Sequence, residues 1–144
     1  FSHLFELSDE ELVARHVVRK TADRSPGFPC RVSLRDAEPG ETVLLVNYEH
    51  LPVASPYRSR HAIYVRRNAI EAQLAVNEVP SVLKIRLLSV RAFDAEGMMT
   101  DAEVVPGSEL AGTVATMLAN RSVAFLHVHN AKPGCFAARV DRAS

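Results

Sequence analysis

The chain has 144 residues, of which 47% are hydrophobic and 24% are charged, and 17 Lys and Arg balance 17 Asp and Glu. This length and composition predict one globular domain, residues 1–144, with a substantial core. The zero net charge provides no cationic field for nucleic acid or an anionic membrane, and two cysteines are too few for a disulfide framework.

The hydropathy and the first residues indicate where the protein resides. No apolar run approaches the roughly 20 residues that cross a bilayer. The chain opens at Phe1, with neither a charged leader nor a cleavage site, so we expect a cytoplasmic protein with a trimmed N-terminus. We expect no nucleic-acid partner, no membrane partner and no cofactor.

The first half of the chain predicts one helix and several strands. Ser8 and Glu11 have the spacing of a capping box, which indicates the start of a short helix. Residues 16–20 suit a strand as well as more helix. Cys30–Leu34 alternates like a half-buried strand, and Thr42–Tyr48 is apolar on both faces, which favours a central strand.

The middle of the chain predicts further strands and a hairpin. Ala62–Val65 is the next expected strand, and a short helix is expected within Ala69–Val76. Val82–Phe93 has the composition of a long strand. Gly97 closes a hairpin turn that requires a positive φ, and Met98–Val105 returns with clean alternation.

The last third of the chain predicts a helix and a closing hairpin. Pro106–Ser108 ends a strand and caps the helix, whose apolar stripe is Leu110, Val114, Met117 and Leu118. Ser122–His129 and Cys135–Asp141 form the hairpin. The fold class is therefore α+β, a single domain with a mostly antiparallel sheet and two or three helices packed on it.

The closing hairpin carries the first candidate site. Residues two apart on a strand share a face, so His127 and His129 point the same way. If the five-residue loop closes symmetrically, His129 lies opposite Cys135, with Arg139 further along the same face. A one-residue slip in register would separate the thiol from the imidazole.

Three kinds of chemistry suit these hairpin residues. Cys135 as nucleophile and His129 as base would make a catalytic pair. His127, His129 and Cys135 could instead ligate a metal, with a fourth ligand from Glu49, His50 or His61. The alternative without a site is a packed face whose histidines bond to the backbone.

A loop rich in cations is the second candidate site. Tyr57, Arg58, Arg60 and His61 could hold a carboxylate or phosphate, with His127 and Arg139 as further ligand-binding residues. The alternatives are arginines that stay solvated, or an arginine that pairs with Glu49 as a structural salt bridge.

Three functions from different classes follow from these sites. The first is a module that binds a small anionic ligand near the Tyr57–His61 loop and the last hairpin. The second is an enzyme that uses the Cys135 and His129 pair. The third is a structural or interaction domain, and unpaired strand edges leave a homodimer open. The two cysteines are expected as separate buried thiols.

Five stretches together resemble a bacterial family catalogued as domain of unknown function 1203. They are Gly27–Leu34, Asn47–His50, Ser55–Arg58, Arg91–Asp94 and His127–Cys135. The resemblance runs from the first helix to the C-terminus and implies a small bacterial protein. It implies no activity, cofactor or catalytic residue.

Overall fold

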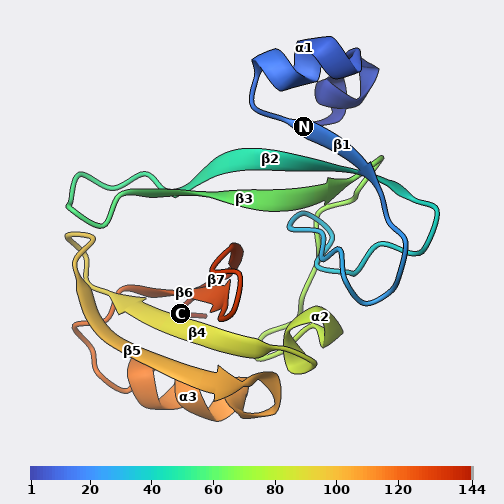
Figure 1. Cartoon of the computed structure of the whole chain (residues 1–144). Helices are drawn as coiled ribbons and strands as arrows, with labels where there is room; N and C mark the ends of the chain where they lie inside the picture. The colour runs from blue at the N-terminus through green and yellow to red at the C-terminus, as the bar shows by residue number, and fades with distance from the viewer. Residues whose placement is uncertain (144) are drawn as a thin grey trace. The chain divides into compact units, whose positions relative to one another are not determined.

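Seven strands form two sheets in the computed structural model, which describes residues 1–143 (Figure 1). The first sheet has the order β1-β2-β3, with β1 at Val18–Thr21, β2 at Thr42–Leu51 and β3 at Ser59–Arg66. The second has the order β5-β4-β6-β7, with β4 at Leu87–Phe93, β5 at Met99–Pro106, β6 at Phe125–Asn130 and β7 at Phe136–Asp141.

Three short α-helices accompany the sheets in the described chain. They are α1 at Asp9–Ala14, α2 at Ser81–Lys84 and α3 at Leu110–Leu118, and 3-10 turns occupy Ser2–Glu6 and Gly107–Glu109. Both sheets are antiparallel, so the predicted α+β class is confirmed. No described helix has the length and apolar character needed to cross a membrane.

The chain divides into two compact units. Phe1–Tyr48 and Ala62–Gln73 make up the first unit. Glu49–His61 and the chain from Leu74 onward make up the second. The ends of β2 and β3 that flank their connecting loop therefore belong to the second unit.

The first unit begins with the predicted capping box. The Ser8 hydroxyl accepts the Glu11 N–H at 3.2 Å, and the Glu11 carboxylate accepts the Ser8 N–H at 3.2 Å. The apolar Thr42–Tyr48 run lies within β2, which is the central strand as predicted. Its Val43 packs in a buried cluster with Phe28, against which the Tyr64 ring also lies.

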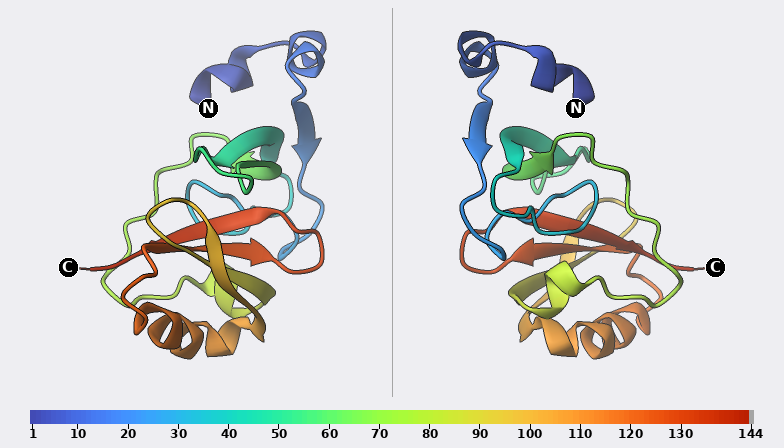
Figure 2. Two further views of the ribbon diagram at one scale, coloured as in Figure 1. Left: turned by 90° about the vertical axis from the view of Figure 1, so that its left-hand side faces the viewer. Right: turned by 90° about the vertical axis from the view of Figure 1, so that its right-hand side faces the viewer.

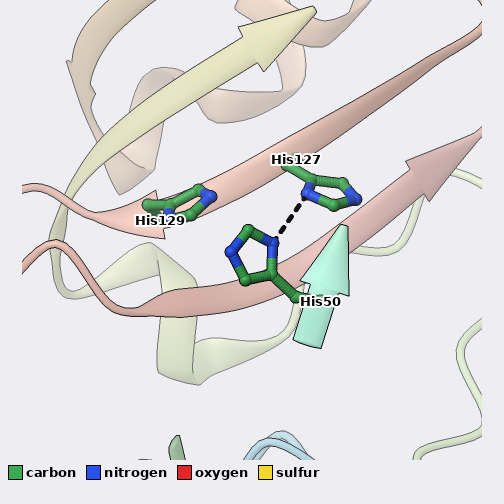
Figure 3. Close-up of side chains that lie close together, drawn as sticks. All are labelled: His50, His127 and His129. Atoms are coloured by element: carbon green, nitrogen blue, oxygen red, sulfur yellow. Dashed lines mark hydrogen bonds between the residues drawn. The ribbon is translucent and has the colours of Figure 1, made fainter. Parts of the chain in front are cut away.

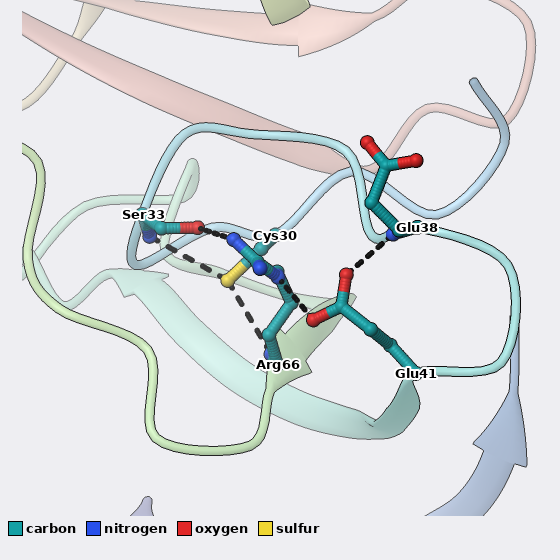
Figure 4. Close-up of polar contacts among 5 residues, drawn as sticks. All are labelled: Cys30, Ser33, Glu38, Glu41 and Arg66. Carbon is teal, nitrogen blue, oxygen red and sulfur yellow. Dashed lines mark hydrogen bonds and ion pairs between the residues drawn. The ribbon is translucent and has the colours of Figure 1, made fainter. Parts of the chain in front are cut away.

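The expected strand at Cys30–Leu34 is wrong, because a turn replaces it. Leu34 has φ 52°, and its N–H donates to the Cys30 carbonyl at 3.0 Å. The Cys30 sulfur accepts N–H bonds from Ser33 at 3.5 Å and Arg66 at 3.4 Å (Figure 4). These bonds curl the backbone around a buried thiol, and alternation in the sequence does not reveal them.

Two expected elements in the middle of the chain are also wrong. Ala69–Val76 is not helical, because Asn68 and Asn77 adopt left-handed backbone conformations at either side. Its apolar residues are mostly exposed, so a helix there would bury no apolar face. The long strand expected at Val82–Phe93 begins only at Leu87, because Ser81–Lys84 forms the helical turn α2.

The second unit places a polar and an apolar face on one sheet. The β4 and β5 hairpin closes at Gly97, which has φ 80° as predicted. On one face, β4, β6 and β7 contribute buried apolar residues, which are Leu88, Val90, Ala92, Leu126, Val128 and Ala138. Helix α3 packs on β4 and β5, opposite the segment Glu49–His61 (Figures 1 and 2). The other face carries the histidines.

Candidate functional site

Four of the six histidines of the chain gather in the second unit. His50, His127 and His129 are buried, with 7%, 0% and 1% of their surfaces exposed, and His61 is half-buried beside them. One ring nitrogen from each of the three buried histidines lies within 4.8 Å of the others. Figure 3 shows the three rings converging from β2 and β6. We call these three residues the histidine cluster.

Two strands and an anchored loop position these side chains. The two-residue period of β6 puts His127 and His129 on one face. His50 lies at the end of β2 and His61 in β3, and the loop between these strands is held by Ser55. The Ser55 hydroxyl donates to the Gly97 carbonyl at 2.8 Å. This bond fixes the loop to the β4 and β5 turn.

A chain of imidazoles runs from the interior toward solvent. Nδ1 of His50 lies 3.2 Å from Nδ1 of His127, and Nε2 of His50 lies 2.6 Å from Nδ1 of His61 (Figure 3 shows the first contact). His50 therefore uses both ring nitrogens, one toward the cluster and one toward half-buried His61. When His50 donates to His61 through Nε2, its Nδ1 lone pair points into the cluster.

The tautomer of His129 follows from its hydrogen bond. Nδ1 of His129 lies 2.9 Å from the Gly134 carbonyl oxygen. A carbonyl only accepts, so Nδ1 carries the proton and Nε2 keeps its lone pair. Gly134 has φ 79°, which presents this carbonyl from the hairpin loop. An N–H to carbonyl bond of this kind orients imidazoles that ligate metals.

Aromatic rings line the cluster and keep water from it. Phe136 stacks on His50 with ring centroids 4.7 Å apart and 9° between the planes, and the Phe93 and Phe125 rings contact His127. The pKa of His129 is lowered to about 3, chiefly by burial; the Gly134 hydrogen bond opposes this shift, and the charges of Arg91, His50 and His61 add to it. His129 is neutral at pH 7, as a metal ligand must be.

The expected pairing of His129 with Cys135 is wrong. His129 pairs with Phe136 and His127 with Arg139, because a bulge shifts the register after Val128. Asn130 closes the hairpin instead, since its N–H donates to the Cys135 carbonyl at 2.9 Å and its side-chain amide to the Cys135 sulfur at 3.2 Å. The expected closure around Asn130–Gly134 fails because Asn130 itself pairs with Cys135, which moves the partner of His129 on by one residue.

Only part of the cationic loop, Tyr57–His61, contributes to the site. His61 is the member that joins the cluster. Arg58 donates to both carboxylate oxygens of Glu49 at 3.0 and 3.4 Å, and Arg60 lies 3.9 Å from the same carboxylate. This is the structural salt bridge foreseen as an alternative. Tyr57 packs against the buried cluster that contains Phe93.

Arg139, the two cysteines and Arg91 complete the set of residues that bear on the site. Arg139 pairs with Asp141 at 2.9 Å and lies over the Phe125 ring at 4.1 Å, on the same face as the histidines. Cys30 and Cys135 are free thiols in separate units, the first buried and the second half-buried. Sequence reasoning overlooked Arg91, although the alternation of β4 places it on the histidine face.

The geometry of the cluster suits a transition metal. Imidazole nitrogens bind zinc at about 2.0–2.1 Å, so two ligands of a tetrahedral ion lie about 3.3 Å apart. The 3.2 Å between the Nδ1 atoms of His50 and His127 fits this spacing. Within the described residues, no carboxylate or thiol belongs to the cluster. A set of three imidazoles suits zinc, copper, iron or nickel.

The fold and this cluster define an α+β protein with a buried three-histidine centre on one face of an antiparallel sheet. The chain belongs to the family described as Protein of unknown function (DUF1203), whose model matches residues 27–142. No curated protein and no solved structure matches the chain.

Proposed function

We propose that this protein binds one divalent transition-metal ion through His50, His127 and His129. The observation that carries the proposal is the convergence of three buried imidazoles within 4.8 Å of one another. A neutral imidazole offers one ring-nitrogen lone pair, and three imidazoles that converge in this way can coordinate one cation. Three protein ligands leave one position of a tetrahedral ion for another ligand.

The surroundings of the cluster support this proposal. The Gly134 carbonyl holds His129 in the tautomer that exposes Nε2, and His61 accepts from or donates to the far nitrogen of His50. Partners of this kind raise the affinity of a site, and their loss typically costs 10–100-fold in metal binding. The aromatic rings around the cluster further exclude competing water ligands.

The enzyme with a thiol nucleophile is less well supported. Cys135 lies opposite Asn130 rather than His129, so no imidazole is its direct cross-strand partner. The notion of a purely packed histidine face explains the burial of the rings. A hydrogen bond between neutral imidazoles also gives the 3.2 Å between the Nδ1 atoms of His50 and His127, so metal binding itself is the discriminating measurement.

Titration with Co²⁺ tests the proposal. The purified chain is stripped with a chelator and titrated while the visible absorption of four-coordinate Co²⁺ is recorded, and Zn²⁺ is then added in competition. We expect one ion per chain. His127→Ala should lower the metal affinity at least about 100-fold, since each imidazole supplies roughly a quarter of the binding free energy of a four-ligand zinc site. Exposed His3 gives the matched control, and His3→Ala should bind as the wild type does.

Two results would count against the proposal. One is the absence of a four-coordinate Co²⁺ spectrum in the folded wild type. The other is equal loss of binding in His127→Ala and His3→Ala. Because His127→Ala leaves a cavity, His129→Gln serves as a second variant if the first does not fold.

A further inference from the structure

We infer that Arg91 holds a small oxyanion beside the metal, so that one oxygen takes the coordination position left by the three histidines. This inference rests on the proposed metal site and names the class of its ligand. The sequence predicts an anion held by the Tyr57–His61 loop near the last hairpin, whereas this inference assigns the anion to Arg91 of β4.

The register places Arg91 next to the histidine cluster. Arg91 lies directly opposite His127 in the β4 and β6 pair, and Ser89 lies opposite His129. Residues paired in this way have side chains on the same face, about 5 Å apart at Cβ. Nε of Arg91 donates at 3.2 Å to the hydroxyl of Ser89, the residue that lies opposite His129.

Electrostatics agrees with this placement. The positive charge of Arg91 lowers the pKa of both His61 and His129, in each case after the larger effect of burial. The charge of Arg91 therefore acts on histidines of both β3 and β6. With Nε bound to Ser89, the two terminal nitrogens of the guanidinium remain as a fork for two oxygens.

Arg91 has no acidic partner among residues 1–143. Its Nε donates to the neutral Ser89 hydroxyl, whereas Arg58 and Arg139 each pair with a carboxylate. Burial alone lowers the pKa of the half-buried Arg91 guanidinium, with no carboxylate to oppose this effect. A half-buried cation without a counter-ion is uncommon, since buried charges are usually paired.

The charge of the loaded site requires an anion. Three neutral imidazoles and a divalent ion carry two positive charges, and Arg91 adds a third. Glu49, the chain neighbour of His50, and Asp141, the cross-strand partner of Phe125, are ion-paired with Arg58 and Arg139. An oxyanion that bridges the ion and the guanidinium would offset this charge at short range. Carboxylate and phosphate share the chemistry needed, which is two adjacent oxygens with negative charge.

The test uses the Co²⁺-loaded chain, with phosphate and acetate as separate probes. Exchange of the fourth ligand changes the visible spectrum, so each titration gives a half-saturating concentration. We expect Arg91→Gln to raise this concentration at least about tenfold, because it removes a bidentate charged contact. Arg139→Gln is the matched control on the other side of His127, and it should change the value by less than about threefold, since that arginine is already ion-paired.

The outcomes separate this inference from the metal site. A response to either anion that depends on Arg91 supports the inference, and the more effective probe identifies phosphate or carboxylate as the ligand chemistry. A normal Co²⁺ spectrum that neither anion changes overturns the inference and leaves the metal site standing. Equal effects of Arg91→Gln and Arg139→Gln also overturn it.

A second measurement covers the case in which Arg91→Gln does not fold. Binding of metal and anion at one site must be reciprocal, so saturating anion should tighten Co²⁺ binding to the wild type by about tenfold. His127→Ala, which retains Arg91, should lose this coupling. Unchanged Co²⁺ affinity in the presence of both anions would refute a bridging oxyanion.

Discussion

A methyl group added at Gly107 has no room, so Gly107→Ala tests how closely the backbone packs in this part of the second unit. Gly107 starts the 3-10 turn before α3, and a Cβ there would lie 1.9 Å from the Leu83 carbonyl oxygen. It would also lie 2.7 Å from main-chain atoms of Lys84. Ordinary carbon–oxygen contacts begin near about 3.3 Å, so the shortfall is about 1.4 Å against backbone that cannot rotate away.

Relief of this clash requires that the chain around Gly107 move away from α2. Overpacking costs about 1–3 kcal/mol, and loss of the Gly107 N–H bond to the Arg86 carbonyl, which is 2.7 Å long, adds about 1 kcal/mol. We therefore expect Gly107→Ala to reduce the free energy of unfolding by about 3 kcal/mol. Gly112 lies within α3 with no atom within 4 Å of a Cβ, so Gly112→Ala should increase it by about 1 kcal/mol.

Urea unfolding of the two variants with a chelator present measures both changes. The midpoint of Gly107→Ala should fall and that of Gly112→Ala should rise, while the m-value stays constant. The chelator removes any contribution of bound metal to stability. A Gly107→Ala variant within about 1 kcal/mol of the wild type would refute the packing of α2 against the 3-10 turn at Gly107–Glu109.

Three further predictions concern the rest of the molecule. Desolvation raises the pKa of Glu41, but the hydrogen bonds from Glu38 and Arg66 together lower it below its ordinary value (Figure 4). The stability of the wild type relative to Glu41→Gln should therefore be present above pH 4.5 and be lost as the pH falls through the folded-state pKa. A stability difference that does not vary with pH in urea titrations would contradict this. In the native protein, iodoacetamide should label half-buried Cys135 and spare Cys30, which is 1% exposed, and mass spectrometry that finds equal labelling would oppose the assignment. Leu126→Ala removes a fully buried side chain of β6 and should cost about 2–5 kcal/mol in urea unfolding, and a loss below 1 kcal/mol would contradict its placement.

Local patterns predicted those elements whose signals are contained in a few neighbouring residues. The capping box at Ser8, the turn at Gly97 and the apolar run of β2 each follow from backbone chemistry or side-chain alternation. Cys30–Leu34 alternates equally well, yet it forms a turn because its thiol accepts backbone N–H bonds, one of them from distant Arg66. A long-range contact of this kind leaves no periodic signal in the sequence.

The site was partly visible in the sequence. The spacing of His127 and His129 predicts that they share one face, and His50 and His61 are predicted as possible distant ligands. Only the folded loop between β2 and β3 brings His50 and His61 to the other two histidines. The hairpin register could not be predicted, because the bulge after Val128 and the pairing of Asn130 with Cys135 leave no signal in the alternation of the strand. Arg91 had a signal, since it is the one charged residue of β4.

X-ray absorption spectroscopy of the Zn²⁺-loaded chain tests the central claim most directly. The proposed site predicts a first shell of nitrogen and oxygen at about 2.0–2.1 Å, with the outer-shell scattering of three imidazole rings and no sulfur. His127→Ala should reduce that pattern to two imidazoles, and His3→Ala should leave it at three. A sulfur ligand at about 2.3 Å, or a wild-type spectrum with fewer than three imidazoles, would contradict a centre built from His50, His127 and His129.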